Sequence, residues 1–421
     1  MTKKDIEAQE KKIRSVTEKV LKSIKPSADE YDAIYKAISF LKQKLSAHLD
    51  ADIIVGGSIA KDTFLRDARD IDIFVRFAAN KKDISERLQK AIQEAGLTYT
   101  RVHGSRDYFR IDFCSRIFEI IPIIKISSPQ QAQNITDISP LHVRWVRKYA
   151  QYADDIRLAK AFAKAHNIYG AESYIRGLSG YCLEILTIHY KGFIGLIRNV
   201  AAWKEKQVID MTKTHVDVLS ELNSSKTFSP LILIDPVDKD RNAAASLSTQ
   251  RYQAFISAAQ QFLKKPSLSS FQASVFSEKR LKRQAGEDDL YIITITTKQG
   301  KEDVIGCRIL KVFEHIKKNL ESHEFKICDA GFEYDKHTTG IVWFIVKEGM
   351  LKKKKLQTGP PINVRKHADD FKRKHPDAYE KDKRLYAKID RKYRRSKDLM
   401  HDLLQDTFIT QRVRSIEMIK K

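Results

Sequence analysis

Apolar residues recur at helical spacing over the first 45 residues of the chain. The first apolar stripe consists of Ile6, Ile13, Val16, Val20 and Ile24. Pro26 follows this stripe, and because proline fits poorly inside a helix, we expect the first helix to end there. Ser27 and Glu30 have the spacing of a capping box. The second stripe consists of Ile34, Ile38, Leu41 and Leu45. The pattern therefore predicts two helices before the first strand.

Short apolar runs separated by turn residues follow these helices. Residues 52–57 are typical of a buried strand that ends in a glycine turn, residues 60–65 of a short helix, and residues 70–77 of a second strand. A further helix is expected near residues 84–95, and residues 108–113 and 117–122 are expected to pair as a hairpin. Together these elements predict an α+β unit of modest size.

The periodicity changes in the rest of the chain. It is helical from residue 154 to residue 263, and residues 289–347 then alternate as strand, helix, strand and strand, like half of a ferredoxin-type fold. The expected core positions of the helical part are Leu158, Phe162, Leu183, Leu186, Ile194, Ile197 and Val200. In the tail, Tyr379, Tyr386 and Tyr393 recur every seven residues, which favours a helical packing seam over stacking on nucleic-acid bases.

These patterns predict an α+β protein with several domains. The expected parts are a head with a mixed sheet over residues 1–150, a helical central domain over 151–265, a small α/β body over 266–350 and a basic helical tail over 351–421. A chain of 421 residues with 42% hydrophobic residues can form several cores. This composition excludes a disordered chain, a collagen and a small disulfide-stapled fold.

Positive charge is concentrated near the end of the chain. Lys and Arg number 77 against 54 Asp and Glu, which gives a net charge of +23. Residues 351–421 hold 22 basic and 10 acidic residues, and therefore +12 of the +23. A large polyanion is the expected partner of such a protein.

The sequence also bears on location and on thiol chemistry. The apolar stretches are too short to cross a bilayer and the N-terminus has no secretory signal, so we expect a cytoplasmic protein with no membrane partner.

The four cysteines are Cys114, Cys182, Cys307 and Cys328. Their spacing fits no metal site, and we expect them to be reduced, buried thiols.

Two carboxylates are expected to lie side by side on the second strand. Alternate side chains of a strand share a face, so Asp70 and Asp72 project together while Ile71 faces the core. Such a pair calls for a hard divalent cation with oxygen ligands, and Mg²⁺ is the natural choice. The preceding glycine turn, with the Ser58 hydroxyl and the Lys61 ammonium, offers donors for a phosphate.

A Gly-Ser pair followed twelve residues later by this carboxylate pair resembles the DNA polymerase beta-like nucleotidyltransferase superfamily. The resemblance implies a head of that fold and a third acid on a neighbouring strand. Asp112 and Glu119 are both candidates, and we choose Glu119 because it precedes Pro122 in an apolar strand. It also implies nucleotidyl transfer with two metal ions, in which the attacking 3′-hydroxyl is activated and pyrophosphate leaves.

Four later segments narrow the resemblance. They begin at His142, Lys160, Arg176 and Asp235, and with the first motif they are similar in order and spacing to archaeal class I CCA-adding tRNA nucleotidyltransferases. The metal ligands that this resemblance implies are Asp70, Asp72 and Glu119. The implied triphosphate contacts are Ser58, Lys61, Lys160 and Tyr169, although the family often has arginine in place of Lys61.

Two further site residues follow from the same resemblance. His142 matches a histidine near the sugar and triphosphate, and a purely structural histidine remains the alternative. Arg241 matches the arginine that reads the base. Cytosine and adenine both present an amino donor beside an unprotonated ring nitrogen, so one arginine can suit both and reject uracil and guanine.

The family resemblance implies that C, C and A are added to the 3′ end of tRNA from CTP and ATP. The basic tail is then expected to hold the acceptor stem and T arm of the tRNA, and a homodimer is left open. A poly(A) polymerase or an oligoadenylate synthetase is the alternative within the superfamily. A catalytically silent RNA-binding protein on the same scaffold is the alternative outside enzymes, and the clustered acids argue against it.

Overall fold

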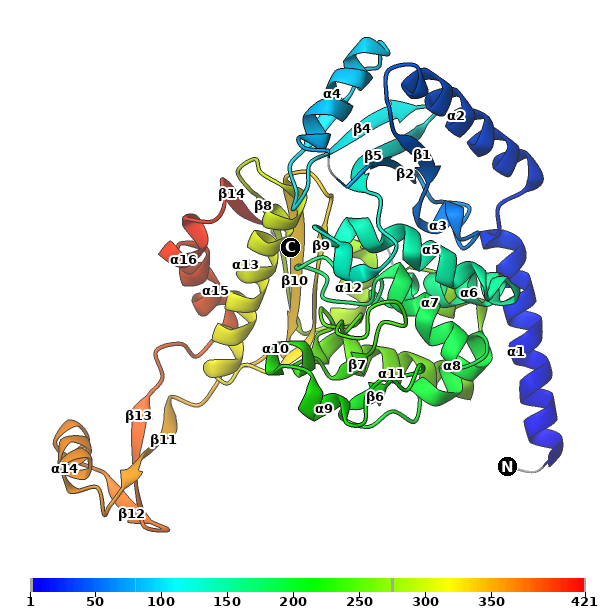
Figure 1. The fold of residues 1–421 in the computed structure, drawn as a ribbon. Coiled ribbons are helices and arrows are strands. Elements are labelled where there is room, and N and C mark those ends of the chain that lie inside the picture. Colours follow the sequence, from blue (N-terminus) through cyan, green and yellow to red (C-terminus); the bar gives the residue numbers. More distant parts are fainter. Residues whose placement is uncertain (1–2, 80, 274–275, 420–421) are drawn as a thin grey trace. The chain divides into compact units, whose positions relative to one another are not determined.

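The computed structural model describes residues 3–79, 81–273 and 276–419 of the chain. The contacts divide the chain into two compact units, Met1–Ser274 and Val275–Lys421. Figure 1 labels their helices and strands. The division into four domains at residues 150, 265 and 350 stays a prediction, because compactness separates two units.

The first unit opens with the two predicted helices. These are α1 (Lys3–Ile24) and α2 (Ala28–Ser46), and the capping box of Ser27 and Glu30 is present at the start of α2. The side chain of Ile6 lies outside the described residues, but Ile13 and Val20 are buried in the core of the helical half of this unit. The apolar face of α1 therefore packs on the helical half, while α2 packs on the head sheet.

The head contains a five-stranded sheet in the order β1-β2-β5-β4-β3. Its strands are β1 (Asp52–Val55), β2 (Asp70–Phe77), β3 (Thr100–Val102), β4 (Tyr108–Phe113) and β5 (Arg116–Ile124). Only β2 and β5 pair in parallel, and β4 and β5 form the predicted hairpin. Helices α2 and α4 (Ile84–Glu94) share one apolar core with this sheet.

The short helix of the head lies earlier than predicted. It is α3 (Gly57–Ala60), so the expectation of a helix over residues 60–65 is wrong. Gly57 has φ +55°, and a Cβ at this position would overlap the carboxylate of Asp72. The glycine thus lets the backbone turn against β2 and begin the helix immediately. The helix ends at Lys61, and Asp62 has a positive φ.

The second half of the unit is mainly helical, as predicted. Its helices are α5 (Ser139–Arg147), α6 (Ala153–Ala165), α7 (Gly180–His189), α8 (Phe193–Val200), α9 (Val218–Glu221), α10 (Ser224–Thr227) and α11 (Thr249–Lys264). Short 3₁₀ turns lie at Pro129–Gln131, Ile135–Ile138, Ala150–Tyr152 and Leu268–Phe271, and β6 (Gln207–Ile209) pairs in parallel with β7 (Leu231–Leu233). The predicted core positions are buried, except that Ile194 is partly buried.

The second unit contains the predicted α/β body. After α12 (Glu278–Ala285) come β8 (Asp289–Thr296), α13 (Glu302–Ser322), β9 (Ile327–Tyr334) and β10 (Thr339–Val346). Strand β10 pairs antiparallel with both β8 and β9, which gives a split β-α-β arrangement, and β14 (Ser415–Ile419) extends the sheet beside β8. This is the half-ferredoxin pattern that the sequence indicates.

Residues 351–419 of the tail mix strands with helices. They form β11 (Lys354–Pro361), α14 (Arg365–Lys374), β12 (Tyr379–Lys381), β13 (Arg384–Asp390), α15 (Ser396–Leu404), α16 (Thr407–Thr410) and the strand β14. Strands β11, β13 and β12 form a separate three-stranded sheet. Helix α14 lies beside this sheet (Figure 1), and Phe371 of the helix shares an apolar cluster with Leu385 of β13.

The helical interpretation of the tail tyrosines is wrong. Tyr379 and Tyr386 lie on β12 and β13 and are partners across the hairpin, with ring centroids 6.0 Å apart. Asp382 and Lys383 both have positive φ and form a two-residue turn that matches the twist of the strands. A spacing of seven residues thus arises from a hairpin rather than from two turns of helix.

Two other expectations concern thiols and membranes. All four cysteines are free thiols. Cys182 is buried and Cys307 is partly buried, but Cys114 and Cys328 are exposed, so the expectation of burial is wrong for the last two. Cys114 lies in the turn between β4 and β5 and Cys328 lies on β9, placements that the spacing of the cysteines does not reveal. Among the described residues, no helix is long and apolar enough to cross a membrane.

Candidate active site

The two aspartates lie on one face of β2, as the alternation predicts. Ile71 and Ile73 are fully buried on the other face, while Asp70 is exposed and Asp72 is partly buried. In the parallel pairing of β2 with β5, Asp72 lies directly opposite Glu119. Burial, followed by the charge of Glu119, raises the pKa of Asp72 to about 6. The three carboxylates therefore lie on the same face of two adjacent strands.

Asp112 has a different position from Glu119. It lies on β4 opposite Ile117, and Ile117 in turn lies opposite Asp70. Asp112 is thus two strands away from the aspartate pair, whereas Glu119 is on the adjacent strand. This register supports the choice of Glu119 as the third acid.

The donor set suits a hard divalent cation. Three carboxylates on one sheet face supply oxygen ligands, and a cation there would relieve the difficulty of ionising Asp72. Glu119 is held by Arg110 at 2.9 Å. Across residues 3–79, 81–273 and 276–419, no three acidic, histidine or cysteine side chains are already gathered to hold an ion. To bind a metal ion together with the aspartates, the Glu119 side chain must therefore either turn away from Arg110 or keep this ion pair while it also contacts the metal.

Two of the predicted triphosphate contacts meet at a buried glutamate. Glu184 on α7 accepts hydrogen bonds from Lys61 and Lys160, each over 2.8 Å. Burial would raise the pKa of Glu184, but the two lysines lower it to about 2, so the carboxylate is charged. Tyr169 reaches the same place, since a Cβ on Gly180 would lie 3.1 Å from its hydroxyl and 3.6 Å from Cε of Lys160.

The other two predicted site residues meet at Asp235. This buried carboxylate accepts hydrogen bonds from Arg241 over 2.6 Å and from Tyr181 over 2.8 Å, and it lies 3.1 Å from Nε2 of His142. Burial lowers the pKa of His142 despite Asp235 and favours the neutral ring. His142 is 8% exposed and therefore also fills a structural position.

Tyr181 joins the two clusters. Its ring stacks on His142 with centroids 4.0 Å apart, and Nζ of Lys61 lies 4.9 Å from the centre of the same ring. Polar contacts therefore run without interruption from Lys160 through Glu184 and Lys61 to Tyr181, and on to the Asp235 cluster. The partly buried Ser58 lies one turn before Lys61, on α3. Helix α3 thus links these clusters to the acidic face of β2, because its Gly57 lies against the carboxylate of Asp72 and Lys61 is its C-terminal cap.

Sequence reasoning assigned no role to Glu184 or Asp235. Each acid stands in an apolar stretch, between Leu183 and Ile185 and after Ile234 respectively. A single acid in a run that is otherwise buried is the available signal, because a buried carboxylate needs cationic or hydrogen-bonding partners.

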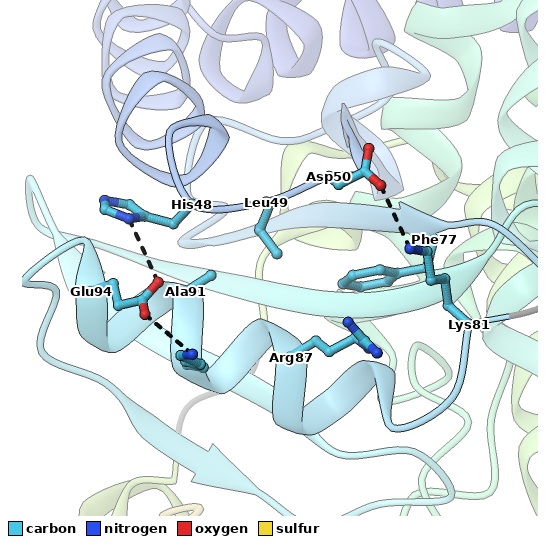
Figure 2. A pocket seen from close by; sticks show the side chains of 9 residues that line it. His48, Leu49, Asp50, Phe77, Lys81, Arg87, Ala91 and Glu94 are labelled. Carbon is cyan, nitrogen blue, oxygen red and sulfur yellow. Dashed lines mark ion pairs between the residues drawn. The ribbon is translucent and has the colours of Figure 1, made fainter.

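A separate cavity of about 180 Å³ lies on the other face of the head sheet, between α4, the end of α2 and the end of β2 (Figure 2). Its lining contains none of the nine candidate residues. Both of its acidic residues are paired: Asp50 lies 3.6 Å from Lys81, and Glu94 lies 3.7 Å from both His48 and Lys90. It is therefore not the site of the acidic cluster.

The mixed sheet and its acidic face define a nucleotidyltransferase of the polymerase beta-like fold. A sequence model described as a nucleotidyltransferase domain matches residues 34–137. A solved cytoplasmic RNA terminal U-transferase superposes with a TM-score of 0.51 at 14% identity and covers 62% of this chain and 100% of its own. A solved poly(U) polymerase also gives 0.51 at 14% identity, covering 61% and 98%. At this identity these two neighbours show the fold alone.

The chain belongs to the family of CCA-adding enzymes. Models described as the second domain of tRNA nucleotidyltransferase and the C-terminal domain of the CCA-adding enzyme match residues 154–272 and 288–416. The CCA-adding enzyme of Nanoarchaeum equitans is 37% identical over 377 residues, or 87% of this chain and 91% of the relative. That of Methanocaldococcus jannaschii is 29% identical over 411 residues, or 93% and 91%.

Proposed function

We propose that this protein adds C, C and A to the 3′ end of tRNA, taking the nucleotides from CTP and ATP and releasing pyrophosphate. The observation that carries the proposal is the 37% identity to a CCA-adding enzyme over nearly the whole of both chains. The placement of Glu119 opposite Asp72 supports an acidic site for such a transfer. We further propose that the protein works in the cytoplasm.

Asp70, Asp72 and Glu119 are the residues that hold divalent metal in this proposal, and Mg²⁺ is the ion that their oxygen donors favour. These residues would hold Mg²⁺ where it could lower the pKa of the 3′-hydroxyl and neutralise charge on the triphosphate. Asp72 lies between the other two proposed metal ligands. Asp70 precedes it on the same strand face, and Glu119 lies opposite it on β5. Ile71 and Ile73 fix that orientation because they are fully buried.

The triphosphate is proposed to lie against Ser58, Lys61, Lys160 and Tyr169. Lys61 supplies a point charge rather than the two-pronged guanidinium of an arginine. Lys160 is 3% exposed, and its ammonium already donates to Glu184 and to both oxygens of Thr63, so direct contact with phosphate requires it to exchange a partner. The hydroxyl of Tyr169 and Cε of Lys160 both lie close to Gly180.

Base selection is assigned to Arg241 with Asp235. Asp235 engages one amino group of the Arg241 guanidinium, and the side chain of Arg241 remains 31% exposed. The other donors suit an acceptor ring nitrogen on cytosine or adenine. His142 is proposed to lie near the sugar and triphosphate, held by the same aspartate.

The tRNA is proposed to bind with its acceptor stem and T arm on the basic second unit. The net charge of +12 over residues 351–421 supports this, because A-form RNA is recognised largely through its phosphates and shape. A homodimer is compatible with this arrangement and is tested by the mass of the protein in solution.

The decisive experiment offers tRNA that lacks its 3′ terminus, with Mg²⁺ and each labelled nucleotide alone and in combination. Addition of C, C and A in order, followed by arrest, is the expected result. Open-ended A tails would instead indicate a poly(A) polymerase, and RNA binding without any incorporation would indicate a silent scaffold. Arg241→Ala is expected to weaken the preference for CTP and ATP over UTP and GTP, and an unchanged preference would remove its base-reading role.

A further inference from the structure

Glu184 is the most deeply buried charged group next to the candidate triphosphate contacts. Its side chain is 1% exposed on α7, where Leu183 and Ile185 are also buried. Its two oxygens accept three hydrogen bonds of 2.8 Å, from Lys61, Lys160 and the hydroxyl of Thr63. Lys61 and Thr63 belong to the head, whereas Lys160 and Glu184 belong to the helical half. One carboxylate thus joins both halves of the first unit.

The two lysines differ in how completely the protein uses them. Lys160 donates to Glu184 over 2.8 Å, to Thr63 Oγ1 over 2.8 Å and to the Thr63 carbonyl over 3.2 Å, which accounts for all three of its N–H groups. Within the described residues, Lys61 makes one such bond, to Glu184, and lies over the ring of Tyr181. Lys61 therefore keeps N–H groups for a phosphate, in a position that Glu184 sets.

We propose that Glu184 is a positioning residue for the nucleoside triphosphate, which holds the Lys61 ammonium at the phosphate subsite and keeps Lys160 charged beside it. The proposal rests on the proposed function, since it assigns the triphosphate of CTP or ATP to this cation pair. Glu184 itself touches no substrate and acts through the lysines.

Charge balance in the cluster explains why the glutamate is needed. Two ammonium groups meet one carboxylate, which leaves one net positive charge for an incoming polyanion. Burial lowers the pKa of Lys160, and Glu184 is the group that opposes this. The other charged or titratable groups facing Lys160 are Lys61 and Arg157, which oppose its charge, and the neutral Tyr169. Without Glu184, we expect Lys160 to lose its proton and Lys61 to lose its fixed position.

The test compares Glu184→Gln with the wild-type enzyme, using the full chain and tRNA that lacks its 3′ terminus. Lys61 and Lys160 interact with phosphate in the ground state and the transition state alike, so the KM for CTP and ATP should rise by at least about tenfold while kcat falls less than about threefold. Inhibition by inorganic tripolyphosphate should weaken by the same factor as KM. This weakening should grow between pH 7 and pH 9 in the variant only, as Lys160 loses its charge.

A purely structural role predicts other results. Asp137→Asn is the matched control, because Asp137 is another fully buried carboxylate of this unit and pairs with Arg106 instead of a lysine. It should lower the melting temperature without changing the KM for nucleotides. Glu184→Asp keeps the charge but is one methylene shorter, so it should raise KM by less than Glu184→Gln.

The outcomes separate this inference from the proposed function. A folded Glu184→Gln or Glu184→Asp enzyme with unchanged KM and unchanged tripolyphosphate inhibition overturns the inference while CCA addition stands. Failure of both variants to fold, with Asp137→Asn folded, also overturns it, because Glu184 would then serve stability alone. If the wild-type protein adds no CCA, direct calorimetric titration with tripolyphosphate still tests the cation pair, and equal affinity in wild type and variant refutes it.

Discussion

Replacement of Asp235 by asparagine is expected to lower stability and to change nucleotide choice. Burial would raise the pKa of Asp235, but hydrogen bonding to His142 and the charge of Arg241 lower it from 3.8 to about 2. A depression of about two units corresponds to about 2–3 kcal/mol of stability. Because the folded pKa is the lower one, this stability is complete above pH 4 and is lost as the pH falls towards 2.

The variant should therefore melt below the wild-type protein at neutral pH. For a unit of this size, a loss of about 2–3 kcal/mol corresponds to a decrease of about 5 °C in melting temperature. The difference should be constant between pH 5 and pH 8 and should shrink below pH 4, where the wild-type carboxylate no longer gains from its partners. Scanning calorimetry at several pH values measures it.

The same variant loosens Arg241. The guanidinium loses a charged partner at 2.6 Å, so the variant should accept UTP more readily relative to CTP. Asp238→Asn is the control, since Asp238 lies in the same loop and its carboxylate accepts a hydrogen bond from the exposed amide of Asp240. An Asp235→Asn protein that melts within about 1 °C of wild type and keeps its selectivity would refute the reasoning.

Three further substitutions test the acidic site and the tail. Glu119→Gln should abolish metal-dependent incorporation, whereas Asp112→Asn should retain it, and the reverse result in a labelled-CTP assay would assign the third acid to β4. Gly57→Ala should reduce incorporation strongly, because the added Cβ overlaps the carboxylate of Asp72 and φ +55° costs an L-residue about 1–2 kcal/mol, and full activity would contradict the close approach. Leu385→Ala removes a side chain that is 1% exposed in the tail sheet, at a cost of about 2–4 kcal/mol. It should weaken tRNA binding in a filter assay while the KM for CTP stays the same, and unchanged binding would place the tRNA contacts elsewhere.

Local patterns predicted the strands of the acidic site well. The alternation around Asp72 required only that β2 have one buried face, and the structure confirms that face. The identity of the third acid depended on strand register, which the sequence does not contain. Glu119 lies directly opposite Asp72 because β5 is placed between β2 and β4. The hairpin of Tyr379 and Tyr386 was missed because a spacing of seven fits a helix and a two-residue turn equally well.

Long-range pairing explains the remaining omissions. Glu184 meets Lys61 across 123 positions of the chain, and Asp235 meets His142 across 93. No local spacing relates such residues, so their roles emerge only when the helical half packs on the head. The early start of α3 also depends on a contact distant in sequence, because Gly57 begins the helix where its backbone lies against Asp72 on β2.

The cationic face of α6 has a consequence for how this enzyme can be divided or recombined. Arg157 binds Asp62 and the carbonyl of Phe64, Lys160 binds Thr63, and Lys164 lies 3.3 Å from Asp67. One helix thus holds the whole loop that follows Lys61, although the matched sequence domains place that loop and α6 on opposite sides of a boundary. An excised head would lack these contacts with α6. A chimera joined between residues 137 and 154 would keep them only if its head came from a protein with matching partner residues in the loop after Lys61. The nucleotidyltransferase domain of this chain is therefore a unit of sequence comparison and not a transplantable module.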